Sequence, residues 1–104
     1  MKRVAFKMKL KEGCFAKYKK RHDEIWSELS IFLSNGGIVN YSIFFDPETN
    51  ILFAYHELLG TGGAQDQGSI PIVQKWWKYM VDIMETNPDN SPVSVPLEEA
   101  FYLK

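Results

Sequence analysis

The stretch that decides the fold is residues 38–58, which reads IVNYSIFF (38–45), DPET (46–49) and NILFAYHEL (50–58). Both outer segments are rich in β-branched and aromatic residues, which favour strands, and Pro47 between them has the fixed φ that suits a turn. The stretch therefore predicts a β-hairpin. Apolar residues occupy both alternating sets of positions in SIFF (42–45) and ILFAY (51–55), so both faces of these strands are expected to be buried.

Toward the N-terminus, residues 3–9 have Val4, Phe6 and Met8 on one side and mostly basic residues on the other, and this alternation predicts a strand. After residue 14 the spacing changes to the three- and four-residue steps of one helix face. This apolar stripe consists of Phe15, Tyr18, Ile25, Trp26, Leu29, Phe32 and Leu33. The first helix is expected to end at Gly36 and Gly37, because glycine accepts the left-handed conformation that closes a helix.

Toward the C-terminus, a second helix is predicted over residues 73–84. The stretch NPDNSPVSVP (87–96) contains three prolines and must be extended or turning, and EAFYLK (99–104) can supply a last short strand. The order β-α-β-β-α-β predicts an α+β ferredoxin-like sandwich with its helices on one face of an antiparallel sheet. Because those helices cover one face only, the second apolar face predicts a homodimer whose sheets pack face to face or share edge strands.

Length and composition restrict the classes of protein to consider. A chain of 104 residues has room for one domain, and 45% hydrophobic, 14% aromatic and 24% charged residues are typical of a globular protein. A net charge of -1 without a long Lys/Arg run argues against nucleic acid or membrane partners, and no apolar run has the length of a secretion signal or a membrane span. The single cysteine, Cys14, suits a reducing compartment, so a cytoplasmic location is expected.

Tyr18 and His22 form the first candidate functional pair. They are four residues apart, so on a helix they lie on one face, within the apolar stripe. A histidine that titrates near neutrality beside a phenol can serve acid/base chemistry on a bound hydroxyl. A histidine satisfied by a hydrogen bond at the edge of the core is an equally good interpretation of these residues alone.

Trp76 and Trp77 form the second candidate. Neighbours on a helix point about 100° apart, so a single core cannot easily accommodate both indoles. One is expected in the core, and the other could form the wall of a pocket in which an indole face packs against the C–H face of a sugar. Tyr41, in the middle of a strand, either belongs to that pocket or covers the sheet edge. NPDNSPVS (87–94) is either a linker or a loop that presents Asn and Ser groups to a polyol at the pocket mouth.

Neither a metal site nor a nucleotide site is indicated by the sequence. His56, in the third predicted strand, could form a metal site together with His22. Two histidines without a supporting cysteine or a well-spaced carboxylate fall short of a zinc site. GTGGAQDQG (60–68) lacks the glycine spacing of a dinucleotide-binding loop and the lysine of a phosphate-binding loop. We therefore expect no metal and no cofactor.

Several segments together resemble the L-rhamnose mutarotases in their order, spacing and total length. They are YKKRHDEIWSEL (18–29), GGIVNYSIFFD (36–46), NILFAYHEL (50–58), QKWWKYMVDIMETNPDNSPVS (74–94) and EEAFYLK (98–104). The paired tryptophans followed by NPDNSPVS are the most specific part. The resemblance implies one mutarotase-like domain over residues 1–104 and a ferredoxin-like homodimer of the dimeric α+β barrel type.

The same resemblance implies roles for individual residues. His22 would be the acid/base residue, and the sugar site would contain Tyr18, Tyr41, Trp76 and Trp77. The substrate would be L-rhamnose, whose α and β anomers interconvert through the open-chain aldehyde without metal or cofactor. In our mechanistic hypothesis His22 protonates the ring oxygen, while a tyrosine or a bound water handles the anomeric proton.

The chain departs from the family's pattern at LLGTGGAQDQGSIPI (58–72), which affects the expected start of the second helix and one pocket wall. Fold alone does not determine function, and two other classes suit a small dimeric α+β domain. One is a sugar-binding module without catalysis, and the other is a heme-handling or monooxygenase-like protein.

Overall fold

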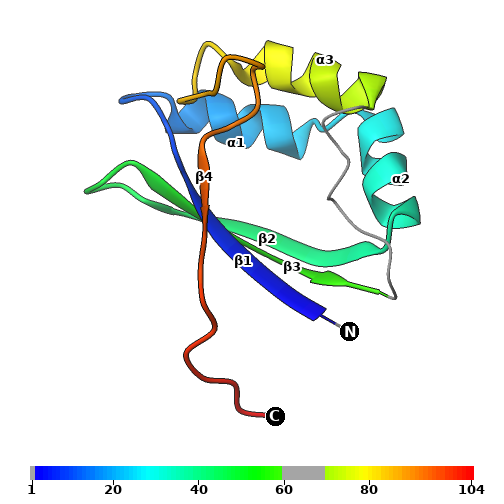
Figure 1. The fold of residues 1–104 in the computed structure, drawn as a ribbon. Coiled ribbons are helices and arrows are strands. Elements are labelled where there is room, and N and C mark those ends of the chain that lie inside the picture. Colours follow the sequence, from blue (N-terminus) through cyan, green and yellow to red (C-terminus); the bar gives the residue numbers. More distant parts are fainter. Residues whose placement is uncertain (1, 60–69) are drawn as a thin grey trace.

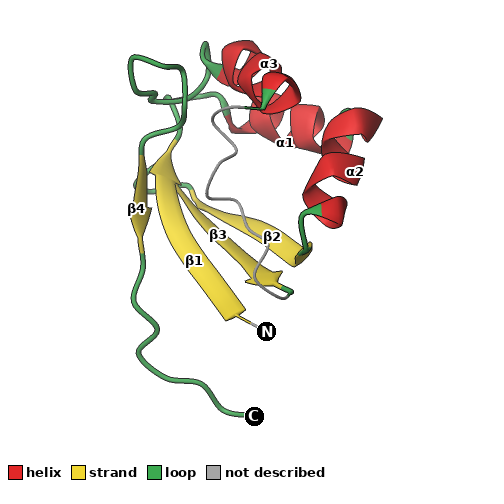
Figure 2. Ribbon diagram, turned by 45° about the vertical axis from the view of Figure 1, so that its right-hand side comes forward, coloured by secondary structure: helices red, strands yellow, loops and turns green. Residues whose placement is uncertain are grey.

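The computed structural model describes residues 2–59 and 70–104, and the elements in these ranges form one sheet with helices above it. In chain order the elements are β1 (Lys2–Lys9), α1 (Phe15–Asp23), α2 (Ser27–Asn35), β2 (Ile38–Asp46), β3 (Ile51–Leu58), α3 (Pro71–Met80) and β4 (Ser94–Pro96). The sheet has four strands in the order β2-β3-β1-β4, and every neighbouring pair is antiparallel. The three helices lie on one face of it, as Figures 1 and 2 show, so the prediction of an α+β fold is confirmed.

The predicted hairpin is present as β2 and β3, which pair from Ile38 opposite Leu58 to Asp46 opposite Ile51. In the turn, the Asp46 carboxylate accepts hydrogen bonds from the backbone N–H of Glu48 at 3.0 Å and from the Thr49 hydroxyl at 2.8 Å. Asn50 ends the turn in the left-handed region, with φ of 59°. Such local bonds from an aspartate are what makes DPET a turn sequence.

A bulge in β2 lies opposite His56. Val39 pairs with Glu57 and Ser42 pairs with Tyr55, so Asn40 and Tyr41 together oppose one residue of β3. Asn40 takes φ of 52° and its amide donates to Glu57 at 2.9 Å. The extra residue switches the side on which the following positions lie, since each added residue inverts the alternation of a strand.

The expected single first helix is in fact two helices, α1 and α2, that meet at residues 24–26. Trp26 has extended backbone angles, with φ of -59° and ψ of 131°, which no continuous helix allows. Its indole packs edge-on against Trp76 with ring centroids 5.1 Å apart. The apolar spacing runs through this break, so periodicity alone predicted one helix where tertiary packing of Trp26 produces a corner. The predicted end is confirmed, because α2 ends at Asn35 and Gly37 has φ of 85°.

The C-terminal half also differs from the prediction at its boundaries. Helix α3 begins at Pro71, in the first helical turn where proline is tolerated, and ends at Met80 instead of residue 84. Ile83 and Met84 leave the helix because they join the sheet edge: the Ile83 carbonyl accepts from Lys11 N–H at 2.9 Å, and Met84 bridges Leu10. The approach to α3 at residues 60–68 lies outside the described residues.

The last strand is β4 at Ser94–Pro96, within the proline-rich stretch, and EAFYLK forms no strand. The C-terminal segment extends away from the sheet (Figure 1). It is tied to β1 by Arg3, whose guanidinium donates two hydrogen bonds of 2.7 Å to Glu99 and lies 3.5 Å from the centre of the Tyr102 ring.

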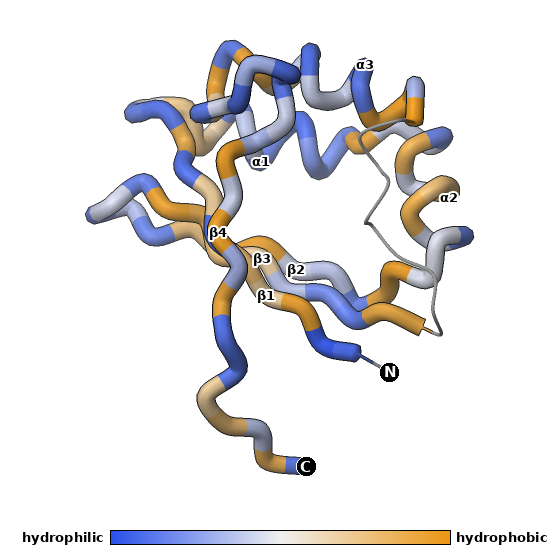
Figure 3. The backbone as a smooth tube through the Cα atoms, viewed as in Figure 1, coloured by the Kyte–Doolittle hydropathy of each residue, from blue (hydrophilic) through white to orange (hydrophobic). Residues whose placement is uncertain are grey.

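The two faces of the sheet have different surroundings. The helix-facing side holds the core, in which Leu10, Leu52 and Ile83 are fully buried. None of the described helices lies on the outer face (Figure 2), yet apolar residues continue along β3, β4 and the C-terminal segment (Figure 3). Phe44 is 69% exposed, Phe53 39% and Val95 47%. In the described ranges, no helix has the length and apolar character needed to cross a membrane.

Candidate active site

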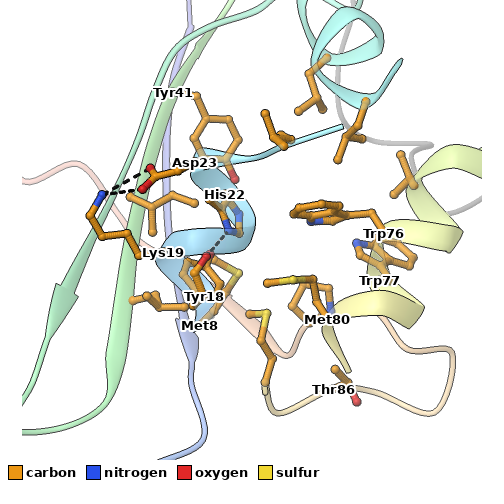
Figure 4. A pocket seen from close by; sticks show the side chains of 18 of the residues that line it. Met8, Tyr18, Lys19, His22, Asp23, Tyr41, Trp76, Trp77, Met80 and Thr86 are labelled. Carbon is orange, nitrogen blue, oxygen red and sulfur yellow. Dashed lines mark hydrogen bonds and ion pairs between the residues drawn. The ribbon is translucent and has the colours of Figure 1, made fainter. Parts of the chain in front are cut away.

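A pocket of about 490 Å³ lies on the helix side of the sheet (Figure 4). Its lining comes from α1, α2, α3, the three longest strands and the loop after α3. All five residues expected from the sequence border this pocket, namely Tyr18, His22, Tyr41, Trp76 and Trp77. The fold therefore brings together side chains that are up to 59 positions apart in the chain.

His22 stands in the last turn of α1 with one ring nitrogen already engaged. Its Nδ1 lies 3.1 Å from the backbone carbonyl oxygen of Tyr18. A carbonyl oxygen only accepts, so Nδ1 carries the proton and Nε2 is the nitrogen left for a ligand. Burial lowers the pKa of His22 below 6.5, although the Tyr18 carbonyl and the Asp23 carboxylate oppose the shift. The imidazole is therefore neutral at pH 7, with a free lone pair on Nε2.

Tyr18 lies directly beside His22, as the four-residue spacing predicted. The two rings stack with centroids 4.2 Å apart and planes 28° from parallel. Tyr18 is only 4% exposed, and burial raises the pKa of its phenol, with the nearby Tyr41 as a smaller cause. Tyr18 thus stays protonated and offers the pocket a hydroxyl that can donate a hydrogen bond.

Tyr41 reaches the pocket because of the bulge in β2. After the bulge, odd-numbered positions of β2 face the helices, which places Tyr41 on the same side as Ile43. Figure 4 shows its hydroxyl directed toward the imidazole of His22. Burial raises the pKa of Tyr41 to about 12, so this phenol is also neutral. In the sequence, an asparagine in the middle of a predicted strand is the one sign of this bulge.

The paired tryptophans both border the pocket, although their burial differs. Trp76 is 9% exposed and belongs to the core, with its indole edge-on to His22 at 5.4 Å between centroids. Trp77 is half-buried and packs against that core from the outside. The expectation of one core indole is met by Trp76, but this core indole also forms part of the pocket wall.

Polar residues that sequence reasoning did not select complete the lining. Lys19 and Asp23 form an ion pair of 3.0 Å along α1, and both border the pocket. Thr86 and Asn90 come from the loop after α3. Asn90 has φ of 73°, and its backbone N–H donates to the Asn87 carbonyl at 2.9 Å. Of the two interpretations of NPDNSPVS, the structure agrees with a loop at the pocket, because Asn90 borders it, whereas the Ser91 hydroxyl is bonded within the loop to Asp89 and Asn87.

A metal site does not form from the two histidines. His56 lies on β3 and does not border the pocket. Within residues 2–59 and 70–104, no three His, Cys, Asp or Glu side chains come together in a metal-binding arrangement. The pocket offers one neutral imidazole, two neutral phenols, an aromatic wall and the polar side chains described above.

Comparison with known proteins agrees with this arrangement. The family model described as L-rhamnose mutarotase matches residues 3–103. The L-rhamnose mutarotase of Bacteroides thetaiotaomicron is 61% identical over 103 residues, covering 99% of both chains. That of Formosa agariphila is 56% identical over 104 residues, covering 100% of both.

The structural comparison covers the same length. A crystal structure of an L-rhamnose mutarotase from Formosa agariphila superimposes with a TM-score of 0.94 at 52% identity, covering 100% of both chains. The resemblance found in the sequence is confirmed at the level of both sequence and fold: this chain belongs to the L-rhamnose mutarotase family.

Proposed function

We propose that this protein interconverts the α and β anomers of L-rhamnose, with His22 as its acid/base residue. The observation that carries the proposal is the state of His22. Its Nδ1 is held by the Tyr18 carbonyl, so a neutral Nε2 is available in an aromatic pocket. Two full-length relatives, 61% and 56% identical, bear the name of this activity.

The proposed ring opening moves one proton from one sugar oxygen to another. Nε2 of His22 accepts the proton of the anomeric hydroxyl, the C1–O1 bond becomes a carbonyl, and the C1–O5 bond breaks. The imidazolium then delivers its proton to O5. Because O1 and O5 are both bonded to C1, one imidazole can reach each in turn. Rotation about C1–C2 followed by the reverse steps gives the other anomer, so atoms and charge balance without a cofactor.

The other site residues hold the sugar in this proposal. The phenols of Tyr18 and Tyr41 donate hydrogen bonds to sugar oxygens, since their raised pKa values keep them protonated and make phenolate an unfavourable base. This differs from the sequence-based hypothesis, in which a tyrosine or a bound water handles the anomeric proton. Trp76 and Trp77 pack against the C–H face of the sugar, as indoles commonly do in carbohydrate pockets.

The test is two-dimensional exchange NMR of the anomeric protons of L-rhamnose. Wild-type protein is expected to give exchange cross-peaks above the buffer rate. His22→Ala should lower the enzyme-dependent rate by about 100- to 10,000-fold, the usual contribution of general acid/base catalysis. The circular dichroism spectrum of this variant should match the wild type. An unchanged rate in His22→Ala would assign the proton transfers to another group.

We also propose that the protein is a homodimer of the ferredoxin-like, dimeric α+β barrel type. The strand order β2-β3-β1-β4 with helices on one face supports the ferredoxin-like description. The apolar outer face supports a partner sheet, because a single chain leaves Phe44 69% exposed and Val95 47% exposed. The lone Cys14 supports a cytoplasmic location for this dimer.

A further inference from the structure

The mechanism above leaves His56 unused, although its surroundings are unusual for a histidine. It lies on β3 on the helix-facing side of the sheet and is 3% exposed. Neither of its ring nitrogens has a hydrogen-bond partner among the described residues. Buried polar side chains are nearly always paired, so an unpaired one calls for an explanation.

Two aromatic rings surround the imidazole. The Tyr41 ring lies 5.1 Å away between centroids, tilted by 35°, and the Phe6 ring approaches it edge-on at 6.0 Å. The charged neighbour in sequence, Glu57, occupies the alternate position on β3 and bonds to Asn40. Val4 is the residue opposite on β1. The surface presented to Tyr41 by His56 is therefore a flat ring in an otherwise apolar setting.

His56 is also the single residue that opposes the bulge. Asn40 and Tyr41 share it as their partner across the β2–β3 pair. The bulge determines the side of the sheet on which Tyr41 lies, but it leaves the side-chain torsions of Tyr41 open. The His56 imidazole lies next to the phenol ring on the neighbouring strand, so it limits the side-chain torsions of Tyr41.

From these contacts we propose that His56 is a positioning residue, which holds the Tyr41 phenol in place at the sugar pocket from the side of the sheet. This inference rests on the proposed role of Tyr41 in binding the sugar. Leucine at position 56 would fill the site with apolar atoms and remove both unpaired nitrogens, but it has no flat face for the phenol. Leucine at position 56 would therefore favour the stability of the fold, whereas histidine favours the placement of Tyr41.

The test is His56→Leu, measured beside Tyr41→Phe and the double variant. His56→Leu should raise the unfolding temperature, because an unpaired buried polar group is removed. Its kcat/KM for L-rhamnose exchange should fall about 2- to 10-fold, the effect of losing one neutral hydrogen bond. Adding His56→Leu to Tyr41→Phe should lower kcat/KM no further, because the residue acts through the phenol.

Leu58→Val is the matched control. Leu58 is buried on the same side of β3 and does not border the pocket. Its shortening should lower the unfolding temperature and leave kcat/KM unchanged. Wild-type kinetics in His56→Leu, or losses that multiply in the double variant, would overturn the positioning role.

A crystal structure of His56→Leu decides the inference without any sugar. The Tyr41 hydroxyl should be displaced from its wild-type position in the pocket, and an unmoved phenol would overturn the proposal. If wild-type protein gives no exchange of rhamnose anomers, the proposed function fails, whereas this displacement still tests His56.

Discussion

His22 acquires its chemistry from its position at the end of α1. The Tyr18 carbonyl one turn earlier fixes the ring through Nδ1, and burial keeps the ring neutral. The same helix turn therefore orients the base and sets its protonation state. This pair could be predicted from sequence, because a four-residue spacing on a helix guarantees that the side chains meet. The choice of ring nitrogen could not, since the hydrogen bond between Nδ1 and the Tyr18 carbonyl forms only in the folded protein.

The neutral state of His22 predicts the pH dependence of the reaction. The proposed mechanism starts from unprotonated Nε2, and burial lowers the pKa of His22 below 6.5. The midpoint of the acidic fall in exchange rate should therefore lie below pH 6.5. Measuring kcat/KM for L-rhamnose exchange against pH checks this, provided circular dichroism shows folded protein throughout.

For a variant at Asp23, the direction in which the pH dependence of kcat/KM shifts can be predicted. Its carboxylate raises the pKa of His22 and so opposes the effect of burial. Asp23→Asn should therefore shift the acidic fall of kcat/KM to lower pH. A shift to higher pH, or no acidic fall in either protein, would contradict the assignment of that limb to His22.

At the scale of elements, the bulge in β2 is the feature that the sequence concealed. The hairpin itself was predictable from strand composition and DPET, but the alternation in IVNYSIFF is apolar on both sets and gives no register. The insertion at Asn40 moves Tyr41 to the helix side of the sheet, where it borders the pocket. The family resemblance thus predicted Tyr41 as a site residue, whereas strand periodicity did not show on which face of the sheet it lies.

Asn40 allows the bulge to be tested through its backbone. Its φ of 52° is left-handed, which glycine adopts freely and a β-branched residue does not. Both Asn40→Gly and Asn40→Val lose the hydrogen bond to Glu57, so their difference isolates the backbone cost. Asn40→Val should be less stable than Asn40→Gly by about 1–2 kcal/mol in urea unfolding. Equal stability of the two variants would mean that the backbone relaxes without strain.

The break between α1 and α2 illustrates a different limit of sequence prediction. The apolar stripe from Phe15 to Leu33 keeps a helical period through the corner, so no local signal ends the first helix. The corner arises from tertiary packing, since Trp26 turns out of the helical path to meet Trp76 and Tyr79. Local patterns predicted the helical residues on either side well, and missed only the contact that separates them.

At the scale of the whole molecule, the sheet separates two surfaces with different chemistry. The pocket lies on the helix side, and the outer face presents Phe44, Phe53 and Val95 to solvent in one chain. The two-sided apolar pattern of β2 and β3 predicted apolar residues on both faces, which the structure has, while burial of the outer face stays a prediction. The C-terminal segment could not be predicted in the same way, because Phe101 and Leu103, each 79% exposed, have apolar character but little packing within the chain.

The proposed dimer can be tested on the outer face without touching the pocket. Phe44 is 69% exposed, more than Phe53 or Val95, so Phe44→Asp is expected to destabilise a single chain little. A carboxylate buried between two sheets would be strongly unfavourable. Light scattering at micromolar concentration should give twice the chain mass for wild type and the single chain mass for Phe44→Asp. Ile31→Asp is the matched control, since Ile31 is 59% exposed on α2 and should leave the dimer intact. The pocket lies across the sheet from Phe44, so the monomeric variant should keep the wild-type exchange rate if its fold survives. A wild-type monomer, or a dimer that persists in Phe44→Asp, would show that this face does not form the interface.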